Sequence, residues 1–466
     1  MKKSLLFIGI VFLFAGCKKW DENLSLATPV VQVAQPISDA APLCGAIKGT
    51  MLTGKTYTIG CDVVINKGDT LTLQPGVHIN VKNKSGIFVQ GALISLGSKD
   101  KPNFITVDSL AALKNDAPNQ DPAKDPAFVG GWAGIYCAST CPMLILKWTH
   151  VEFAGNGLSI AQGALVNQSS GTAFSILFQN PTGIFVMEDS WLYGGVDDPI
   201  RISNGRICFM RSTFEKAGIK GGDCLNTKGG TVGDMAYNLF VGIATNGQKA
   251  SNKGQPVGGQ QTNINMWNNT FIACGYRQIQ TGRGANINFE EGARGMAFNN
   301  LMVNCKFGLR IVNNPAADTA NIRYGYNYEY GDSLVVVNQI YPTNAGLSGG
   351  WTRPMSTDIP DYKTFLPANY QFGDTYDGTP VIQKNNPLFY NFPLPVPGNI
   401  PLYGIQAVNK YDFRLQAGSP AIGKGFTGFA PVGAVPIDPV YGVTEMTLPG
   451  IDIGAFQSNG KGNQHY

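Results

Sequence analysis

Four basic residues recur through the middle of the chain, each shortly after a short apolar segment: Arg201, Lys220, Arg277 and Arg310. A positive side chain can neutralise the carboxylate of an acidic sugar. A lysine or arginine with a lowered pKa can then remove the proton beside that carboxylate. Lys220, Arg277 and Arg310 are therefore candidate catalytic residues if the fold brings them into one groove. The alternative is a solvated face of mixed charge, because acidic and basic residues mingle over 283–294.

Acidic residues offer a second kind of chemistry. Asp223 follows Gly222 and precedes Cys224, and it is a candidate catalytic acid, with a turn residue as the alternative. Asp197 and Asp198 stand before a proline, which favours a turn over a calcium or general-acid pair. No cofactor is required by these residues. Calcium is the one candidate, although the EF-hand spacing is missing, and we expect no other metal.

Four tyrosines alternate along one short segment: Tyr324, Tyr326, Tyr328 and Tyr330. In a single extended strand all four would point to the same face. Such a face could stack against sugar rings, so these tyrosines are candidate ligand-binding residues. The alternative is an aromatic ladder that caps the fold.

The cysteines predict a disulfide framework. Besides Cys17, the chain has eight, an even number that suits an exported protein. Proximity along the chain favours four pairs: Cys44 with Cys61, Cys137 with Cys141, Cys208 with Cys224, and Cys274 with Cys305. A zinc site is disfavoured, because the Cys137–Cys141 spacing has no second ligand pair nearby.

A repeat in the middle of the chain indicates which elements must position these residues. The apolar anchors Leu192, Phe214, Phe240, Phe271 and Met302 are separated by 22, 26, 31 and 31 residues, by subtraction. No amphipathic helix fills the gaps, so each interval matches one coil of a β-solenoid. Three anchors follow an asparagine by two places, and stacked asparagines can satisfy buried amides at a coil corner: Asn238, Asn269 and Asn300.

Several segments resemble the right-handed parallel β-helix superfamily, the fold of pectin and pectate lyases. They include Gly-Asp-Thr-Leu-Thr-Leu-Gln-Pro-Gly-Val at 68–77, Gly-Trp-Ala-Gly-Ile at 131–135 and Asp-Ile-Gly-Ala-Phe at 452–456. The resemblance implies an all-β, single-domain, right-handed parallel β-helix with a long insertion near the C-terminus. The segment at 222–228 is also similar to polygalacturonases, but Gly222 replaces the first aspartate of their pair, and their Gly-His-Gly and Arg-x-Lys motifs are missing.

The N-terminal residues predict export and lipidation. Lys2 and Lys3 precede an uncharged apolar run that ends in Leu-Phe-Ala-Gly-Cys at 13–17. A cysteine after Ala-Gly resembles the lipobox of bacterial lipoproteins, which implies that residues 1–16 are a signal peptide and that Cys17 is lipidated. We expect a tether over 17–43 and the β-helix over 44–457. Within it, 341–410 is an insertion and 411–457 form terminal coils, and a tail follows at 458–466.

Composition limits the function. Removing residues 1–16 lowers the formal charge from +4 to +2, by subtraction of two lysines, and only 14% of residues are charged. This excludes a nucleic-acid footprint, and the apolar run is too short to span a bilayer. We expect a monomeric, lipid-anchored protein of the outer membrane that binds a polysaccharide or another extended ligand. Exposure at the cell surface and membership of an outer-membrane protein complex are both compatible with this expectation. The alternatives are a polysaccharide lyase, favoured over a hydrolase, and a structural or adhesive envelope protein.

Overall fold

The structure is a computed structural model. It describes residues 35–336 apart from 119, 257, 281–282, 313–314 and 334, the backbone of 351–352, residue 383, and residues 386–466. The described residues form one compact unit. Cys17, the predicted signal peptide and most of the predicted tether lie outside the described residues, and so does most of the predicted insertion at 341–410.

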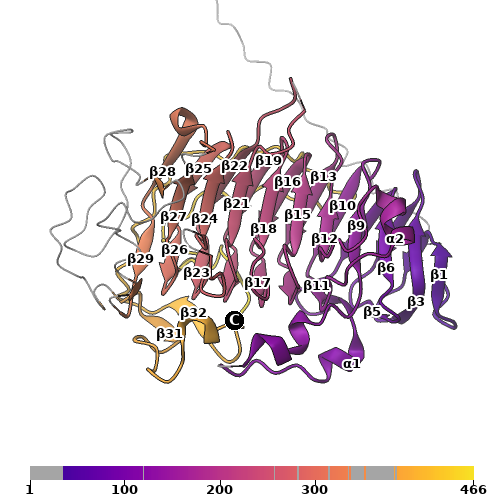
Figure 1. Cartoon of the computed structure of the whole chain (residues 1–466), viewed down its shortest axis with the longest axis horizontal. Coiled ribbons are helices and arrows are strands. Elements are labelled where there is room, and N and C mark those ends of the chain that lie inside the picture. Colours follow the sequence, from indigo (N-terminus) through magenta and orange to yellow (C-terminus); the bar gives the residue numbers. More distant parts are fainter. Residues whose placement is uncertain are drawn as a thin grey trace, which may run out of the picture. The chain divides into compact units, whose positions relative to one another are not determined.

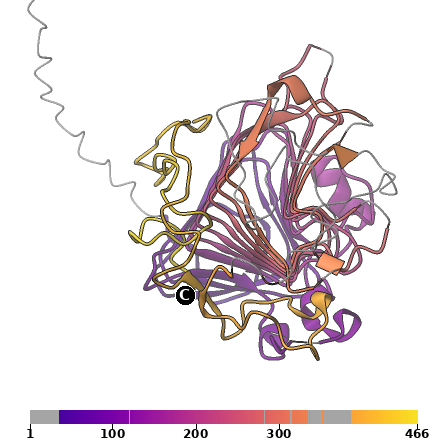
Figure 2. The ribbon, with the colours of Figure 1, turned by 90° about the vertical axis from the view of Figure 1, so that its left-hand side faces the viewer.

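The described chain winds into a parallel β-helix, which confirms the predicted fold class (Figure 1). Each regular coil contributes one short strand to each of three faces, and strands of successive coils pair in parallel. Seen along the axis, equivalent strands lie behind one another (Figure 2). The strands of face A are β2 (Gly49–Met51), β4 (Thr70–Leu73), β7 (Ala92–Leu96), β10 (Met143–Lys147), β13 (Ile184–Glu188), β16 (Arg206–Met210), β19 (Val232–Ala236), β22 (Asn263–Trp267), β25 (Arg294–Phe298) and β28 (Ile322–Gly325).

Faces B and C are joined by β3 (Thr56–Ile65), whose first half pairs with β5 and whose second half pairs with β6. Face B contains β5 (His78–Val81), β8 (Asn103–Thr106), β11 (Thr149–Glu152), β14 (Trp191–Tyr193), β17 (Thr213–Glu215), β20 (Leu239–Val241), β23 (Thr270–Ile272), β26 (Leu301–Val303) and β29 (Tyr328–Tyr330). Face C contains β1 (Leu43–Ala46), β6 (Gly86–Val89), β9 (Gly134–Cys137), β12 (Ile176–Phe178), β15 (Ile200–Ser203), β18 (Leu225–Lys228), β21 (Gln248–Ser251), β24 (Ile287–Glu290), β27 (Leu309–Val312) and the antiparallel β30 (Trp351–Thr352).

The predicted anchors lie in register on face B. Each is the direct partner of the next, from Leu192 through Phe214, Phe240 and Phe271 to Met302. The three phenylalanine rings stack inside the core, with centroids 4.9 Å and 4.7 Å apart. A coil cannot bury its apolar side alone, so this stacking across coils supplies the core.

The predicted asparagine ladder is confirmed at the corner before face B. The side-chain amide of Asn238 donates to Asn269 at 3.2 Å, and that of Asn269 donates to Asn300 at 2.9 Å. Asn327 continues the ladder one coil further, at 2.9 Å from Asn300. The Oδ1 atoms of Asn269, Asn300 and Asn327 also accept the main-chain N–H of the asparagine one coil earlier. Each asparagine of the ladder is therefore hydrogen bonded to its neighbour.

Short helices and loops cover the outside of the first coils. The helix α2 (Ile160–Val166) has a capping box, in which Ser159 accepts from the N–H of Gln162 and Gln162 accepts from that of Ser159. The remaining helical turns among the described residues are α1 (Asp108–Ala111), η1 (Pro122–Lys124), η2 (Pro126–Phe128), η3 (Thr319–Asn321) and η4 (Leu402–Gly404). None of these helices is long and apolar enough to cross a membrane.

The prediction that residues 411–457 form terminal coils is wrong. Their main strand is β32 (Asp412–Leu415), which pairs antiparallel with β31 (Phe389–Asn391). The chain then runs back along the outside of the solenoid, seen in yellow in Figures 1 and 2. Phe426 donates its N–H to Asn299 at 2.8 Å, Val432 and Gly433 donate to Asp234, and the Lys147 ammonium donates to the carbonyl of Gly442.

The returning chain is held by side chains that point outward from the coils. Gly450 donates to Asn268 at 3.0 Å and Ala455 donates to Thr270 at 2.8 Å. The predicted tail at 458–466 is not loose, because His465 is buried against Trp191 and hydrogen bonds Thr213 at 2.8 Å. Apolar motifs near the C-terminus therefore cover the solenoid rather than extend it.

One predicted disulfide is present. Cys44 and Cys61 are bonded, with their Cα atoms 5.0 Å apart, and they tie β1 to β3. The other three predicted pairings are corrected, because the remaining six described cysteines are buried thiols: Cys137, Cys141, Cys208, Cys224, Cys274 and Cys305. Cys208 lies on face A whereas Cys224 directly precedes β18 of face C, so proximity along the chain was misleading for that pair. Cys274 and Cys305 directly follow the paired strands β23 and β26 and lie within hydrogen-bonding reach of each other, but no disulfide joins them.

Candidate functional site

A cavity of about 440 Å³ lies on the outer side of face C, over β18, β21, β24 and β27. Alternation in these strands sends one set of side chains into the core and the other outward. Five outward residues on successive strands of face C are direct register partners and form one row along the solenoid: Arg201, Asn226, Lys249, Asn288 and Arg310. The fold thus builds a continuous polar row from residues 201–310, and the cavity covers its last part.

Asp223 enters this site because of the glycine before it. Gly222 has φ +95°, and a Cβ there would lie 2.3 Å from the main-chain oxygen of Asp197. Only glycine allows this close approach without strain. The N–H of Asp223 then donates to Asp198 at 2.6 Å, and Asn226 donates to both carboxylates, at 2.8 Å and 3.1 Å. Asp198 therefore lies beside Asp223 in the structure. The two form a pair of aspartates even though the residue directly before Asp223 in the sequence is Gly222.

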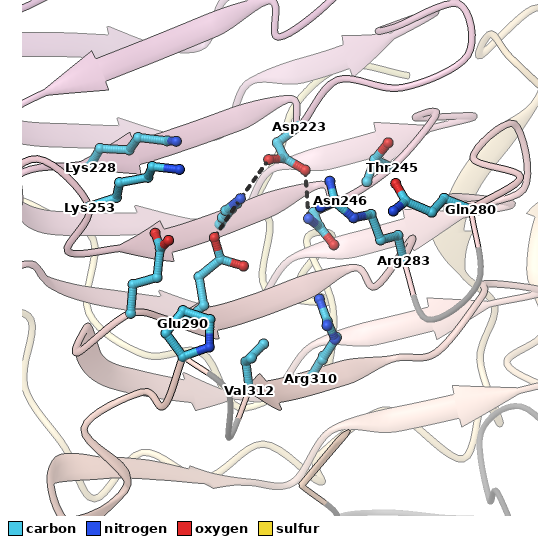
Figure 3. A pocket seen from close by; sticks show the side chains of 13 residues that line it. Asp223, Lys228, Thr245, Asn246, Lys253, Gln280, Arg283, Glu290, Arg310 and Val312 are labelled. Atoms are coloured by element: carbon cyan, nitrogen blue, oxygen red, sulfur yellow. Dashed lines mark hydrogen bonds and ion pairs between the residues drawn. The ribbon is translucent and has the colours of Figure 1, made fainter. Parts of the chain in front are cut away.

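An ion-pair chain of one buried and two half-buried side chains lines the cavity. The Lys249 ammonium lies 3.2 Å from Asp223 and 2.7 Å from Glu290. Dashed lines in Figure 3 mark ion pairs at the labelled Asp223 and Glu290. Glu290 also accepts from Asn288 at 2.9 Å, and Arg310 donates to Asn288 at 3.1 Å. Asn246 donates to the second oxygen of Asp223 at 2.6 Å. One lysine thus serves two carboxylates, and the surrounding amides fix their orientation.

The two carboxyl groups have pKa values shifted in opposite directions. Burial, together with the Asp198 and Glu290 carboxylates, raises the pKa of Asp223, although Lys249 opposes the shift. Burial acts in the same sense on Glu290, but the charge and hydrogen bond of Lys249 outweigh it and hold the pKa of Glu290 below its usual value. Ionisation of this cluster is therefore set by how the single lysine is shared.

Basic side chains lie at both ends of this acidic centre. In Figure 3, Lys228 and Lys253 lie on one side of Asp223 and Glu290, and Arg283 and Arg310 lie on the other. Burial lowers the pKa of Lys228, and the nearby cations Arg201 and Lys249 lower it further. Burial also lowers the pKa of Arg310. The lining holds five basic and three acidic side chains, a net charge of +2 by subtraction when all are ionised.

The structure brings together only part of the predicted catalytic set. Asp223 and Arg310 both line the cavity. Lys220 is exposed in the loop between β17 and β18 and is not part of the lining. Arg277 is buried and donates to the main-chain oxygens of Ala217, Gly218 and Gly242. The predicted single groove of Lys220, Arg277 and Arg310 is therefore wrong, because similar spacing after an anchor does not place side chains on the same face.

Sequence reasoning did not single out Lys228, Lys249 or Lys253 as site residues. A signal was present only for Lys249, because Asn226, Lys249, Asn288 and Arg310 occupy the second position of successive strands of face C. The anchors that revealed the repeat lie on face B, and nothing in their spacing defines the register of another face.

The proposed stacking face of tyrosines is also corrected. Tyr324 belongs to β28 on face A, whereas Tyr328 and Tyr330 belong to β29 on face B. The chain turns the corner at Tyr326, where φ is 54°. Tyr324, Tyr328 and Tyr330 are buried, and Tyr326 stacks on Phe426 with centroids 5.1 Å apart. The four tyrosines therefore form no common exposed face, because three rings are buried and Tyr326 is half-buried against Phe426.

A metal site finds no support among the described residues, where no three His, Cys, Asp or Glu side chains are grouped to hold an ion. Asp198, which the sequence offered as part of a calcium pair, binds Arg201 and accepts hydrogen bonds from Asp223 and Asn226. Three further aspartates, in the loop before β9, likewise have structural partners. Asp121 and Asp125 cap the turns η1 and η2, and Asp116 and Asp125 pair with Lys216.

Comparison with known proteins adds little. No family model matches the chain, and no curated protein matches it. Among solved structures, the Dettilon tailspike protein (gp208) is similar at 9% identity and a TM-score of 0.23, over 59% of this chain and 54% of the tailspike chain. The chain thus spans about half the length of that protein. A TM-score this low bears on neither fold nor function, which rest on the strands and side chains described above.

Proposed function

We propose that this protein binds an acidic polysaccharide along the outer side of face C, in the cavity between Lys228 and Arg310. The observation that carries the proposal is the excess of basic over acidic side chains in a cavity on a long polar row. Parallel strands repeat every 4.8 Å or so, and a solenoid therefore presents a regular, elongated surface. An extended polyanion can contact several coils at once.

Binding is tested by affinity electrophoresis and calorimetry with acidic and neutral polysaccharides. We expect acidic glycans to bind and neutral glucans not to bind, with affinity that falls as salt rises. Lys228→Gln should weaken binding about tenfold, the loss of one charged hydrogen bond. Lys48→Gln is the matched control, because Lys48 is an exposed lysine of the first coils that pairs with Asp69. Equal binding of neutral and acidic glycans would contradict the proposal.

A lyase is the second candidate, and the lowered pKa of Lys228 favours it. A neutral Lys228 could take the proton next to a uronate carboxylate that Arg201, a cation close to it, neutralises. The test is the ultraviolet absorbance of unsaturated products during incubation with polyuronates and sulfated glycans. We expect that signal to be lost in Lys228→Gln. No signal from the wild type over a broad panel would leave binding as the function.

We further propose that the protein is exported and lipid-anchored at Cys17, which supports a role at the cell envelope. The lipobox-like sequence at 13–17 motivates this proposal. Labelling with a radioactive fatty acid should mark the wild type but not Cys17→Ser, and membrane fractionation should show the variant released. Unlabelled wild-type protein would contradict anchoring without affecting the glycan-binding proposal.

A further inference from the structure

The cavity on face C has a charge order that narrows the ligand class. Along the axis, β18 supplies Lys228, β21 supplies Lys249, β24 supplies Glu290 and β27 supplies Arg310. Lys228 and Arg310 are therefore three strands apart, roughly 14 Å at the usual spacing between strands. Asp223 and Glu290 lie between these two basic ends (Figure 3). The order is basic, acidic, basic.

The centre of the cavity disfavours an anion. Lys249 is already paired with both Asp223 and Glu290, so these three side chains sum to −1 when ionised. A ligand carboxylate placed there would face two carboxylates that share the Lys249 ammonium, and the next cation, Arg310, lies one strand beyond Glu290. Repulsion of this kind selects against a wrong ligand as effectively as new contacts select for the right one.

The centre instead offers a hydrogen-bond acceptor. Asn246 is 4% exposed and lines the cavity. Its Nδ2 donates to Asp223, while its Oδ1 has no hydrogen-bond partner among the described residues. A buried amide oxygen requires a donor, and a sugar hydroxyl or an N-acetyl N–H supplies one.

We infer that the ligand is a polysaccharide in which acidic sugars alternate with neutral, donor-bearing sugars, rather than a chain with a carboxylate on every residue. Two acidic groups would then meet Lys228 and Arg310, and a neutral sugar would lie over Glu290 and Asn246. The inference rests on the proposed binding function and specifies its ligand class.

The test compares hyaluronan oligosaccharides, which alternate a uronate with N-acetylglucosamine, with oligogalacturonates and mannuronate oligomers of matched length. We expect the alternating oligosaccharide to bind at least about tenfold more tightly at equal charge concentration. Lys228→Gln and Arg310→Gln should each weaken that binding. Glu290→Gln should increase the affinity for the homopolyuronates and reduce the preference. Glu445→Gln, a change at an exposed glutamate outside the cavity lining, is the matched control.

The outcomes separate this inference from the function on which it rests. Homopolyuronates that bind as tightly as the alternating polymer, with both lost in Lys228→Gln, would overturn the alternation and leave acidic-glycan binding intact. No binding of any acidic glycan would overturn both. A Glu290→Gln protein that melts as the wild type does but keeps the full preference would also overturn the inference, because the preference would not depend on the central carboxylate.

Discussion

Arg277 illustrates how a charged residue can be structural. Its guanidinium donates to the main-chain oxygens of Ala217 and Gly218 and to that of Gly242, and its plane lies over the ring of Phe128. Those carbonyls belong to the corners of two earlier coils, where the chain turns away from the ladder. Burial lowers the pKa of Arg277 to about 10, so it stays charged at neutral pH. It joins coils rather than contacting a ligand.

Arg277→Met should therefore lower stability without changing glycan affinity. Three main-chain oxygens would lose charged donors, which costs about 2–4 kcal/mol in the free energy of unfolding. The measurement is chemical denaturation together with binding at a temperature where the variant is folded. Lys220→Met, at an exposed residue, is the control and should change neither the free energy of unfolding nor the glycan affinity. Weaker binding by folded Arg277→Met would show that it acts at the ligand site.

The coil corner is the element that fixes register. Asn269 accepts two N–H groups from Asn238 and donates to Met235 and to Asn300, so one amide joins three coils. Buried polar groups of this kind favour a single alignment, since a shift by one residue would leave each rung unpaired.

Asn269→Ala should destabilise the protein by about 2–4 kcal/mol, because buried donors and acceptors on both sides lose their partner. Thermal and chemical unfolding measure the loss. Asn321→Ala is the matched control: Asn321 is exposed and bonds only its neighbour Asp318, so a change within about 0.5 kcal/mol is expected. Equal effects of the two substitutions would contradict a structural role for the ladder.

The hydrogen bond between Glu215 on β17 and the C-terminal chain predicts that stability depends on pH. Burial raises the pKa of Glu215 to about 7, and its carboxyl accepts the N–H of Val408 at 2.5 Å. Because its pKa is higher in the folded state than in the unfolded state, protonation of Glu215 stabilises the folded protein. The stabilising contribution is complete below the ordinary value of 4.5 and is lost as the pH rises to about 7.

Across that window we expect Glu215 to account for a decrease of about 3 kcal/mol in the free energy of unfolding. Glu215→Gln keeps an acceptor for Val408 but cannot ionise, so the loss on going from pH 5 to pH 8 should shrink. Denaturant midpoints at both pH values measure the difference. An identical pH dependence in wild type and variant would place the ionisation elsewhere, for example at Asp234 or Glu329, whose pKa values are also raised.

At the scale of the whole molecule, each coil contacts mainly its two neighbours, so stability is nearly one-dimensional. The described solenoid begins at β1, whose outer edge lacks a preceding coil. The Cys44–Cys61 disulfide ties this first strand to β3. An end coil has only one neighbour and is therefore the part of a solenoid that opens most easily. The disulfide lies in this part of the described solenoid.

Replacing Cys44 and Cys61 by serine should therefore loosen the first coils and leave the rest unchanged. The bond spans 17 residues, for which chain entropy predicts about 3 kcal/mol. Hydrogen exchange should accelerate over residues 35–65 and stay unchanged from β10 onward. Cys305→Ser, which removes one buried thiol far along the solenoid, should not alter exchange in the first coils. Acceleration throughout the chain would show that the solenoid unfolds as one cooperative unit.

Much of the fold follows from the sequence by itself. The spacing of Leu192, Phe214, Phe240, Phe271 and Met302 defines coil length, since one residue per coil must fill the same core position. The asparagine before three of these anchors predicts a ladder, because a buried amide at a corner needs a partner in the next coil. Both are local patterns that recur along the chain, and their recurrence allows them to be recognised from the sequence.

Other features were decided only by the tertiary structure. Asp198 and Asp223 meet because Gly222 lets two coils approach, and Lys228, Lys249 and Arg310 share a cavity because their strands are aligned on face C. Which thiols remain unpaired, which tyrosines are buried and where the C-terminal chain runs also depend on the faces to which residues belong. Loops of very unequal length connect those faces, so distance along the chain does not determine position around the coil.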